Sequence, residues 1–436
     1  MPSKLRTKKL EHVTTKSHDN NFTVPEACPQ IYIVDIEMPA CSDQDSGAGE
    51  RILTLDVWDE CSSSASGSCS IVFEDVYAAH DSATLEYLKE LSSRRKAIEE
   101  SINESSFITE AIAREMAGGS ESRYEQDIYK IEQYLPLLEI LFEYVGLKSF
   151  SNRIAQCTAA LNIRWSSALC SSSFFNFKGP KFFQIDHLGF ELVMTLFLYG
   201  GILRERALEV LSADLVQSAT IFRQAAGIYH YMADENSSIS RFLIDYKFPP
   251  EKPPETLAIV SYIMSLICLA EAQAVTIRKA EEKGTSSSLL AKLHHGVTSF
   301  LDEAFQLYSI TKFKDISPRL LDFISSSMCL HEFKGNQYLA ESLKESGQIG
   351  AAIGVLSSAL NNVKKKIPGE DPWKSTYQKQ IQVASEVLRK FNHENDFVWH
   401  EKIPPKDKLP SPQCSKIVTF IPYRPKNWER KLVFKQ

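Results

Sequence analysis

From Asp81 onwards the apolar residues recur with the spacing of α-helices, and this period constrains the fold more than any other feature of the sequence. In the segments 85–102 and 128–145, leucine, isoleucine and other apolar residues fall three, four or seven positions apart. Such a stripe marks one face of a helix, and another helix must cover that face to shield it from water. The sequence therefore predicts a mainly α-helical fold.

Prolines and glycines set further helix boundaries. One helical block is predicted from Leu208 to Tyr229. The proline-dense stretch 249–254 interrupts the pattern, because proline lacks the N–H that a helix interior needs. After this stretch we expect an apolar helix from near Glu255 to about Ala280. Gly284–Ser286 ends that helix, and a new one follows.

A helix pair with the character of a tetratricopeptide hairpin is predicted in residues 320–366. Small residues at helical spacing allow two antiparallel helices to approach closely, and Gly347 suits the tight turn between them. A last helix is expected from about Ser375 to Phe391. The chain from Ile403 onwards is rich in proline and is predicted to be extended.

The N-terminal residues do not show the helical period. Residues 1–27 are polar and basic, and we predict a mobile tail there. Strand-like runs at Ile31–Ile36 and Ile52–Trp58, with a shorter apolar run at Ile71–Phe73, predict a small N-terminal β-sheet. The aromatic, lysine-containing segment Phe174–Phe183 is interpreted as a loop between long helices.

Composition excludes several classes of protein. The formal net charge of −6 is opposite to that of a typical nucleic-acid binder, so no nucleic-acid partner is expected. The nine cysteines include no Cys-x-x-Cys pair, which argues against disulfides and zinc and favours reduced cytosolic thiols. The apolar runs 192–203 and 256–270 are shorter than the roughly 20 residues that span a bilayer, and both predict buried helices.

No familiar catalytic or cofactor motif is found. The sequence lacks a phosphate-binding Gly-Lys-Ser/Thr loop, a His-Glu-x-x-His motif and a Gly-x-Ser-x-Gly elbow. His294 and His295 are adjacent and would point about 100° apart on a helix, which does not suit one metal ion. We therefore predict no catalytic residue, no metal site and no cofactor. An enzyme of unrecognised type, using one of the cysteines, is the minor alternative.

Three segments resemble the BRO-domain family, and together they span most of the chain. Glu394–Pro404, with the sequence Glu-Asn-Asp-Phe-Val-Trp-His-Glu-Lys-Ile-Pro, is similar to the family's segment after its last long helix. Leu269–Gln273 resembles the family's Leu-Ala-Gln-Ala-Gln helix, and Lys279-Ala280 follows it at the matching distance. Gln224–Tyr229 resembles its stretch of small residues before an aromatic one.

The resemblance implies a curved, boomerang-like helical body that forms a single domain, predicted here as residues 28–420 with a basic extended tail at 421–436. It also implies an adaptor function without catalysis. Such a protein would bind the C-terminal amphipathic helix of an ESCRT-III subunit and support multivesicular-body sorting, as a cytoplasmic protein recruited to the endosome.

Carried over by position, the family's groove corresponds to Thr276, Leu289 and Leu293. The two leucines lie four residues apart on one helical face, whereas Thr276 stands where the family has a large aromatic residue. Ile277 or Val275 would compensate only with some rotation of the helix. The other interpretation of the leucines is core packing, which is the commoner fate of such a pair.

Two further hypotheses remain open. The alternative to the ESCRT adaptor is a generic tetratricopeptide-like scaffold that binds peptides outside this pathway, an idea motivated by residues 320–366. The chain after Lys402 is rich in lysine and arginine, which permits weak contact with an anionic membrane surface. A solvated segment is the plainer interpretation of those charges.

Overall fold

The computed structural model describes residues 71–102, 122–147, 160–170, 182–311, 316–368, 371–426 and 430–435. These residues belong to one compact unit, Ile33–Gln436. The predicted tail at residues 1–27 and the predicted strands Ile31–Ile36 and Ile52–Trp58 lie outside the described residues.

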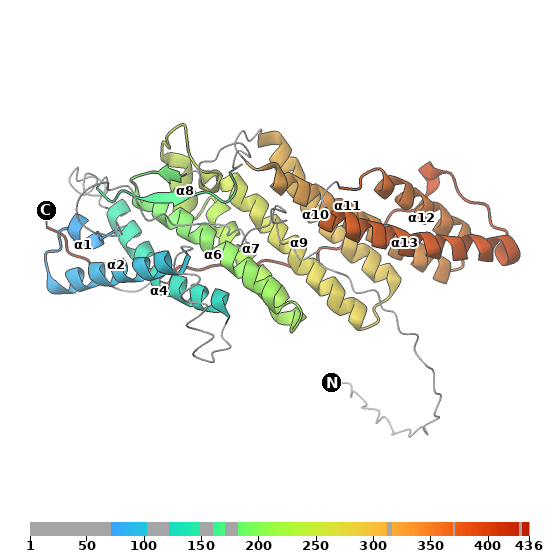
Figure 1. Cartoon of the computed structure of the whole chain (residues 1–436), viewed down its shortest axis with the longest axis horizontal. Coiled ribbons are helices and arrows are strands. Elements are labelled where there is room, and N and C mark those ends of the chain that lie inside the picture. The colour runs from blue at the N-terminus through green and yellow to red at the C-terminus, as the bar shows by residue number, and fades with distance from the viewer. Residues whose placement is uncertain are drawn as a thin grey trace, which may run out of the picture. The chain divides into compact units, whose positions relative to one another are not determined.

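The described chain is mainly α-helical, as predicted, and Figure 1 shows its helices in chain order. The main elements are α1 (Phe73–Val76), α2 (Ser82–Ile102), α4 (Arg123–Leu147), β1 (Arg164–Ser166), β2 (Phe182–Gln184), α6 (Leu188–Val210), α7 (Leu215–Ala233), α8 (Ser238–Asp245), α9 (Ala258–Glu282), α10 (Ser287–Thr311), α11 (Pro318–Glu345), α12 (Ile349–Lys364) and α13 (Asp371–Glu394). From α6 to α13 the long helices pack mainly on their neighbours in the chain. Each long apolar stripe is therefore buried by the next helix, as the periodicity requires.

Two predicted assignments differ from the structure where it describes them, at Phe73 and at the end of the segment 174–183; residues 174–181 lie outside the described residues. Phe73 begins the short helix α1 instead of ending a strand, and the acidic Glu74 and Asp75 in its first turn suit a helix N-terminus. The end of the segment 174–183, predicted as loop, forms strand β2, in which Phe183 pairs with Trp165 of β1 in antiparallel register. Both aromatic side chains are buried, so the pairing is driven by the core.

The predicted block Leu208–Tyr229 is two helices. Asp214 adopts an extended conformation between α6 and α7, and its carboxylate accepts hydrogen bonds from the backbone N–H groups of Val216 and Gln217. This cap satisfies two N–H groups that the start of a helix leaves unpaired. The apolar period continues across the break, which explains why periodicity alone merged the two helices.

The apolar helix predicted after the proline-rich stretch is confirmed as α9. It begins at Ala258, and Glu255 lies before it, buried, where it accepts hydrogen bonds from Ser167 and from the backbone of Ala168 and Leu169. Among the described helices, α9 is long and apolar enough to cross a membrane by length and composition. Most of its residues are buried by the other helices, as in the core helix of a folded domain.

The predicted hairpin in residues 320–366 is confirmed by α11 and α12. Gly347 joins them with φ of +81°, a left-handed conformation that glycine adopts without strain. A similar residue, Gly284 with φ of +67°, ends α9. The last predicted helix, Ser375–Phe391, is confirmed as the central part of α13.

After α13 the chain turns back across the helices as an extended segment, here called the C-terminal strap (residues 400–426 and 430–435). Asn395 makes the turn: its side-chain amide donates to the carbonyl of Glu401 at 3.0 Å and accepts from the Glu401 N–H at 2.9 Å. The other end reaches α1, where the N–H of Lys435 donates to the carbonyl of Ala78 at 2.8 Å. Figure 1 shows the strap returning from α13 to the first helices.

Candidate partner-binding site

The structure separates the four residues predicted to line the groove. Leu289, on α10, is 43% exposed, and Thr276, on α9, is half-buried with its hydroxyl bonded to the carbonyl of Ala272 at 2.8 Å. Leu293 is 3% exposed and Ile277 is 1% exposed, and both belong to the main core. The expectation that both leucines stay uncovered is therefore wrong for Leu293, and Ile277 cannot replace the missing aromatic residue.

Leu289 and Thr276 lie at the same level of the antiparallel pair α9–α10. The side-chain amide of Gln273 donates to the carbonyl of Leu293 at 2.7 Å, which fixes the register of the two helices. Gly284 lies in the connection between the two helices. One helical turn closer to this connection than the Gln273–Leu293 bond, the same register places Thr276 of α9 beside Leu289 of α10. The candidate site is thus an exposed leucine next to a small, half-buried threonine, where the resemblance implies a large aromatic residue.

Lysines border this surface. Lys279 lies three residues after Thr276 and Lys292 lies three residues after Leu289, so each lysine shares a helix face with its neighbour. The Lys279 ammonium pairs with Glu282 at 3.0 Å. The charge of Lys279 is therefore balanced by a carboxylate, which leaves Lys292 as the basic side chain beside Leu289.

A buried polar cluster lies one turn along α10. The Nδ1 atoms of His294 and His331 are 3.0 Å apart, and burial lowers the pKa of both histidines well below the usual range, so both are neutral at pH 7. Burial also lowers the pKa of the neighbouring Lys334 to about 8. Tyr338 donates to Glu281 at 2.6 Å and stacks on His294. The His294–His331 contact joins α10 to α11, and the Tyr338–Glu281 bond joins α11 to α9, so the cluster ties the three helices together.

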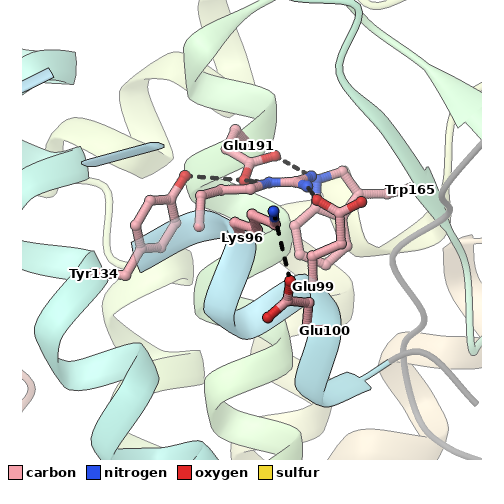
Figure 2. Close-up of polar contacts among 7 residues, drawn as sticks. Lys96, Glu99, Glu100, Tyr134, Trp165 and Glu191 are labelled. Carbon is pink, nitrogen blue, oxygen red and sulfur yellow. Dashed lines mark hydrogen bonds and ion pairs between the residues drawn. The ribbon is translucent and has the colours of Figure 1, made fainter. Parts of the chain in front are cut away.

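A buried charge network lies elsewhere, where α2, α4, α6 and β1 meet (Figure 2). Glu191 accepts hydrogen bonds from Arg95 at 3.2 Å, from Tyr134 at 3.0 Å and from Trp165 at 2.7 Å. Burial alone would lower the pKa of Arg95, but the carboxylates of Glu191 and Glu99 outweigh it and raise that pKa. All five side chains are buried, so the network joins helices and is closed to a substrate.

The described cysteines differ in exposure: Cys268 and Cys329 are buried, Cys170 is half-buried and Cys414 is exposed. Within the described ranges of the chain, no group of three or more His, Cys, Asp or Glu side chains is placed to hold a metal ion. Burial raises the pKa of Cys268 and of Cys329 above the usual range, which disfavours the reactive thiolate.

The strap contacts the helices at several points, whereas most of its lysines and arginines are exposed to solvent, as the plainer interpretation of these charges expected. Phe420 stacks on His230 with ring centroids 3.9 Å apart, and Leu432 is buried. Its basic residues are partly engaged: Lys416 pairs with Glu303 at 3.2 Å and Arg430 pairs with Glu90 at 3.4 Å. These pairs reduce the charge that the strap could offer to a membrane. The division of the chain after residue 420 stays a prediction.

The fold is that of a mainly α-helical module, and the exposed Leu289 on α10 is its candidate contact for a partner. Comparison with known families then gives the identity. The chain belongs to the family of the BRO1-like domain, whose model matches residues 86–435.

Relatives in other organisms match the chain over a part of their length. "Apoptosis-linked gene 2-interacting protein X 1" of Caenorhabditis elegans is 23% identical over 296 residues, which are 64% of this chain and 32% of that protein. "BRO1 domain-containing protein BROX" of Homo sapiens is 26% identical over 240 residues, 51% of this chain and 56% of that protein. The chain thus spans about a third of the first of these relatives and about half of the second.

Solved structures share the fold. The chain covers 97% of the structure described as "ALIX BRO1 CHMP4C complex", with 87% of its own residues, a TM-score of 0.63 and 17% sequence identity. It covers 92% of the chain in "Structure basis for endosomal targeting by the Bro1 domain", with 86% of its own residues, a TM-score of 0.58 and 16% identity. The likeness extends over nearly the whole of each domain, which confirms the predicted fold class.

Proposed function

We propose that this protein is a non-catalytic cytoplasmic adaptor that binds the C-terminal amphipathic helix of an ESCRT-III subunit and supports multivesicular-body sorting at the endosome. The observation that carries the proposal is the match to the BRO1-like domain over residues 86–435, with a fold that covers 97% of an ALIX domain solved with CHMP4C. The second solved domain is described by its endosomal targeting, which supports recruitment to the same compartment.

The binding surface in this proposal is centred on Leu289. An amphipathic helix would place one apolar side chain against Leu289, beside the half-buried Thr276. Covering the exposed part of one leucine contributes roughly 1 kcal/mol, so a micromolar complex, which needs about 8 kcal/mol, must use the surrounding surface as well. Lys292 favours a partner helix with an acidic residue next to its apolar face.

Peptide binding tests the proposal directly. The labelled C-terminal helix of an ESCRT-III subunit is titrated with the full chain, and binding is followed by fluorescence anisotropy. Leu289→Asp should weaken binding at least about tenfold, because a carboxylate would be forced into an apolar contact. Ile310→Asp is the matched control: Ile310 is also exposed, on the same helix α10, but lies about 30 Å away.

Two results would count against this function. The first is the absence of binding between the folded wild-type chain and the peptide. The second is a Leu289→Asp variant with unchanged circular dichroism and unchanged affinity. Loss of binding in both Leu289→Asp and Ile310→Asp would show that charge on α10, and not the proposed surface, controls the interaction.

A further inference from the structure

We propose that Gln273 is a positioning residue for the partner-binding surface, acting by fastening the C-terminal strap to the pair α9–α10. This inference rests on the proposed function, which supplies the partner. Gln273 itself is fully buried and does not reach the surface at Leu289. It acts through the two helices that carry that surface.

The Gln273 side chain joins three parts of the chain through one amide group. Its Nε2 donates to the carbonyl of Leu293 on α10 at 2.7 Å and to the carbonyl of Ser415 in the strap at 2.9 Å. Its Oε1 accepts from the backbone N–H of Ile417 at 3.0 Å. A carboxamide offers two donors and an acceptor at one end, whereas glutamate offers acceptors alone and methionine has neither.

Gly296 makes this arrangement sterically possible. A Cβ added at Gly296 would lie 2.2 Å from Gln273 Nε2 and 2.2 Å from the Ser415 carbonyl oxygen. The backbone of the strap therefore lies directly on α10, and the Ser415 N–H donates to the carbonyl of Lys292 at 3.1 Å. The strap and Gln273 meet α10 one turn beyond Leu289.

The position of these bonds gives them a role in binding. Apolar helix faces tolerate small rotations and slides, whereas hydrogen bonds fix the separation and register of two helices. Gln273 lies three residues before Thr276, and its acceptor Leu293 lies four residues after Leu289. Loosening the bond should therefore alter how Thr276 and Leu289 are presented together. By linkage, a bound partner should in turn hold the strap more firmly.

The test measures hydrogen exchange and peptide affinity on the full chain. Gln273→Met keeps the length of the side chain and removes all three bonds, and Gln273→Glu keeps the acceptor alone. We expect both to speed exchange at the Ser415 and Ile417 amides at least tenfold and to weaken binding of the ESCRT-III peptide about fivefold. Gln337→Met is the matched control, because Gln337 bonds to Glu341 on its own helix, and should change neither quantity.

A second variant changes the strap and leaves the core intact. Ile417→Pro removes the N–H that donates to Gln273, while the Ile417 side chain is itself exposed. It should speed exchange at the Ser415 amide and weaken peptide binding as Gln273→Met does; position 417 itself has no amide hydrogen to follow in this variant. If the strap exchanges faster in these variants while peptide affinity stays within twofold of wild type, the inference is overturned. This second variant also decides the matter if Gln273→Met does not fold.

The outcomes also separate this inference from the proposed function. If the wild-type chain binds no ESCRT-III peptide, the proposed function fails. Hydrogen exchange in residues 285–293 then tests whether the strap is coupled to the surface around Leu289. Faster exchange there in Ile417→Pro supports a positioning role of the strap for this surface. Unchanged exchange there, with a loosened strap, overturns it.

Discussion

Replacing Glu139 by glutamine should make the stability of the protein less dependent on pH. Glu139, on α4, is buried, and its Oε1 accepts a hydrogen bond from the Tyr423 hydroxyl of the strap at 2.8 Å. Its Oε2 has no hydrogen-bond partner among the described residues. Burial raises the pKa of Glu139 to about 7, and the hydrogen bond from Tyr423 opposes this only in part.

The sign and size of the effect follow from this pKa. The folded-state value of about 7 lies above the ordinary value of 4.5, so folding favours the protonated carboxyl. The contribution of Glu139 to stability is fully present below pH 4.5 and is lost as the pH rises to about 7. A difference of this size corresponds to about 3 kcal/mol. The side chain introduced by Glu139→Gln would stay neutral throughout and could still accept the hydrogen bond from Tyr423.

Urea unfolding of the wild type and Glu139→Gln across pH 4.5 to 8 measures the effect. The new amide N–H₂ will lack a partner and will lower stability at every pH. The diagnostic quantity is therefore how the difference in free energy of unfolding between the two proteins changes with pH. This difference should move by about 3 kcal/mol in favour of Glu139→Gln as the pH rises. Other titrating groups, such as the buried Glu255, are common to both proteins and cancel.

Glu86 on α2 supplies the control, because it is exposed and, unlike Glu143, is not among the charges that act on Glu139. Glu86→Gln removes an identical charge and should change the pH dependence by less than about 0.5 kcal/mol. A stability difference between wild type and Glu139→Gln that is constant from pH 4.5 to 8 would refute the reasoning. So would an equal pH dependence for Glu86→Gln.

Two further predictions concern the free energy of unfolding, measured with urea. Glu191→Leu should lower it by about 3–5 kcal/mol, because this change leaves the buried Arg95 without its main partner. Glu100→Gln removes the exposed pair with Lys96 (Figure 2) and should lower it by less than about 1 kcal/mol; equal losses would contradict this. Gly347→Ala should lower it by about 1–2 kcal/mol through its positive φ alone, since no atom lies within 4 Å of the new Cβ. Gly347→Asn should lower it by less.

The parts of the fold that depend on local signals could be predicted from the sequence. The apolar period and the glycine at residue 347 predicted the pair α11–α12, and the apolar run after Pro254 predicted α9. In each case the signal and the structure lie within a few residues of one another. Asp214, the N-cap of α7, was also a local signal of a helix start. It was missed because the apolar period continues across it, so α6 and α7 were predicted as one helix there.

Local sequence signals could not predict which residues of the candidate site are exposed. Leu289 and Leu293 have the same residue type and share a helix face, yet the first is exposed and the second is buried. The difference depends on which part of α10 the other elements cover, and these elements come from distant parts of the sequence. The pairing of β1 with β2 and the path of the strap are non-local for the same reason.

The strap gives a physical account of the three segments that resembled the family. Gln224–Tyr229 contains Gly227, where an added Cβ would lie 1.8 Å from the carbonyl oxygen of Ile421 in the strap. Leu269–Gln273 ends in the residue that bonds Ser415 and Ile417, and Glu394–Pro404 contains the Asn395 turn that starts the strap. Each segment therefore holds one point along the same extended chain. The resemblance in these three segments therefore concerns the residues that hold the strap against the helices. None of the segments includes Leu289, so its role in binding must be tested separately.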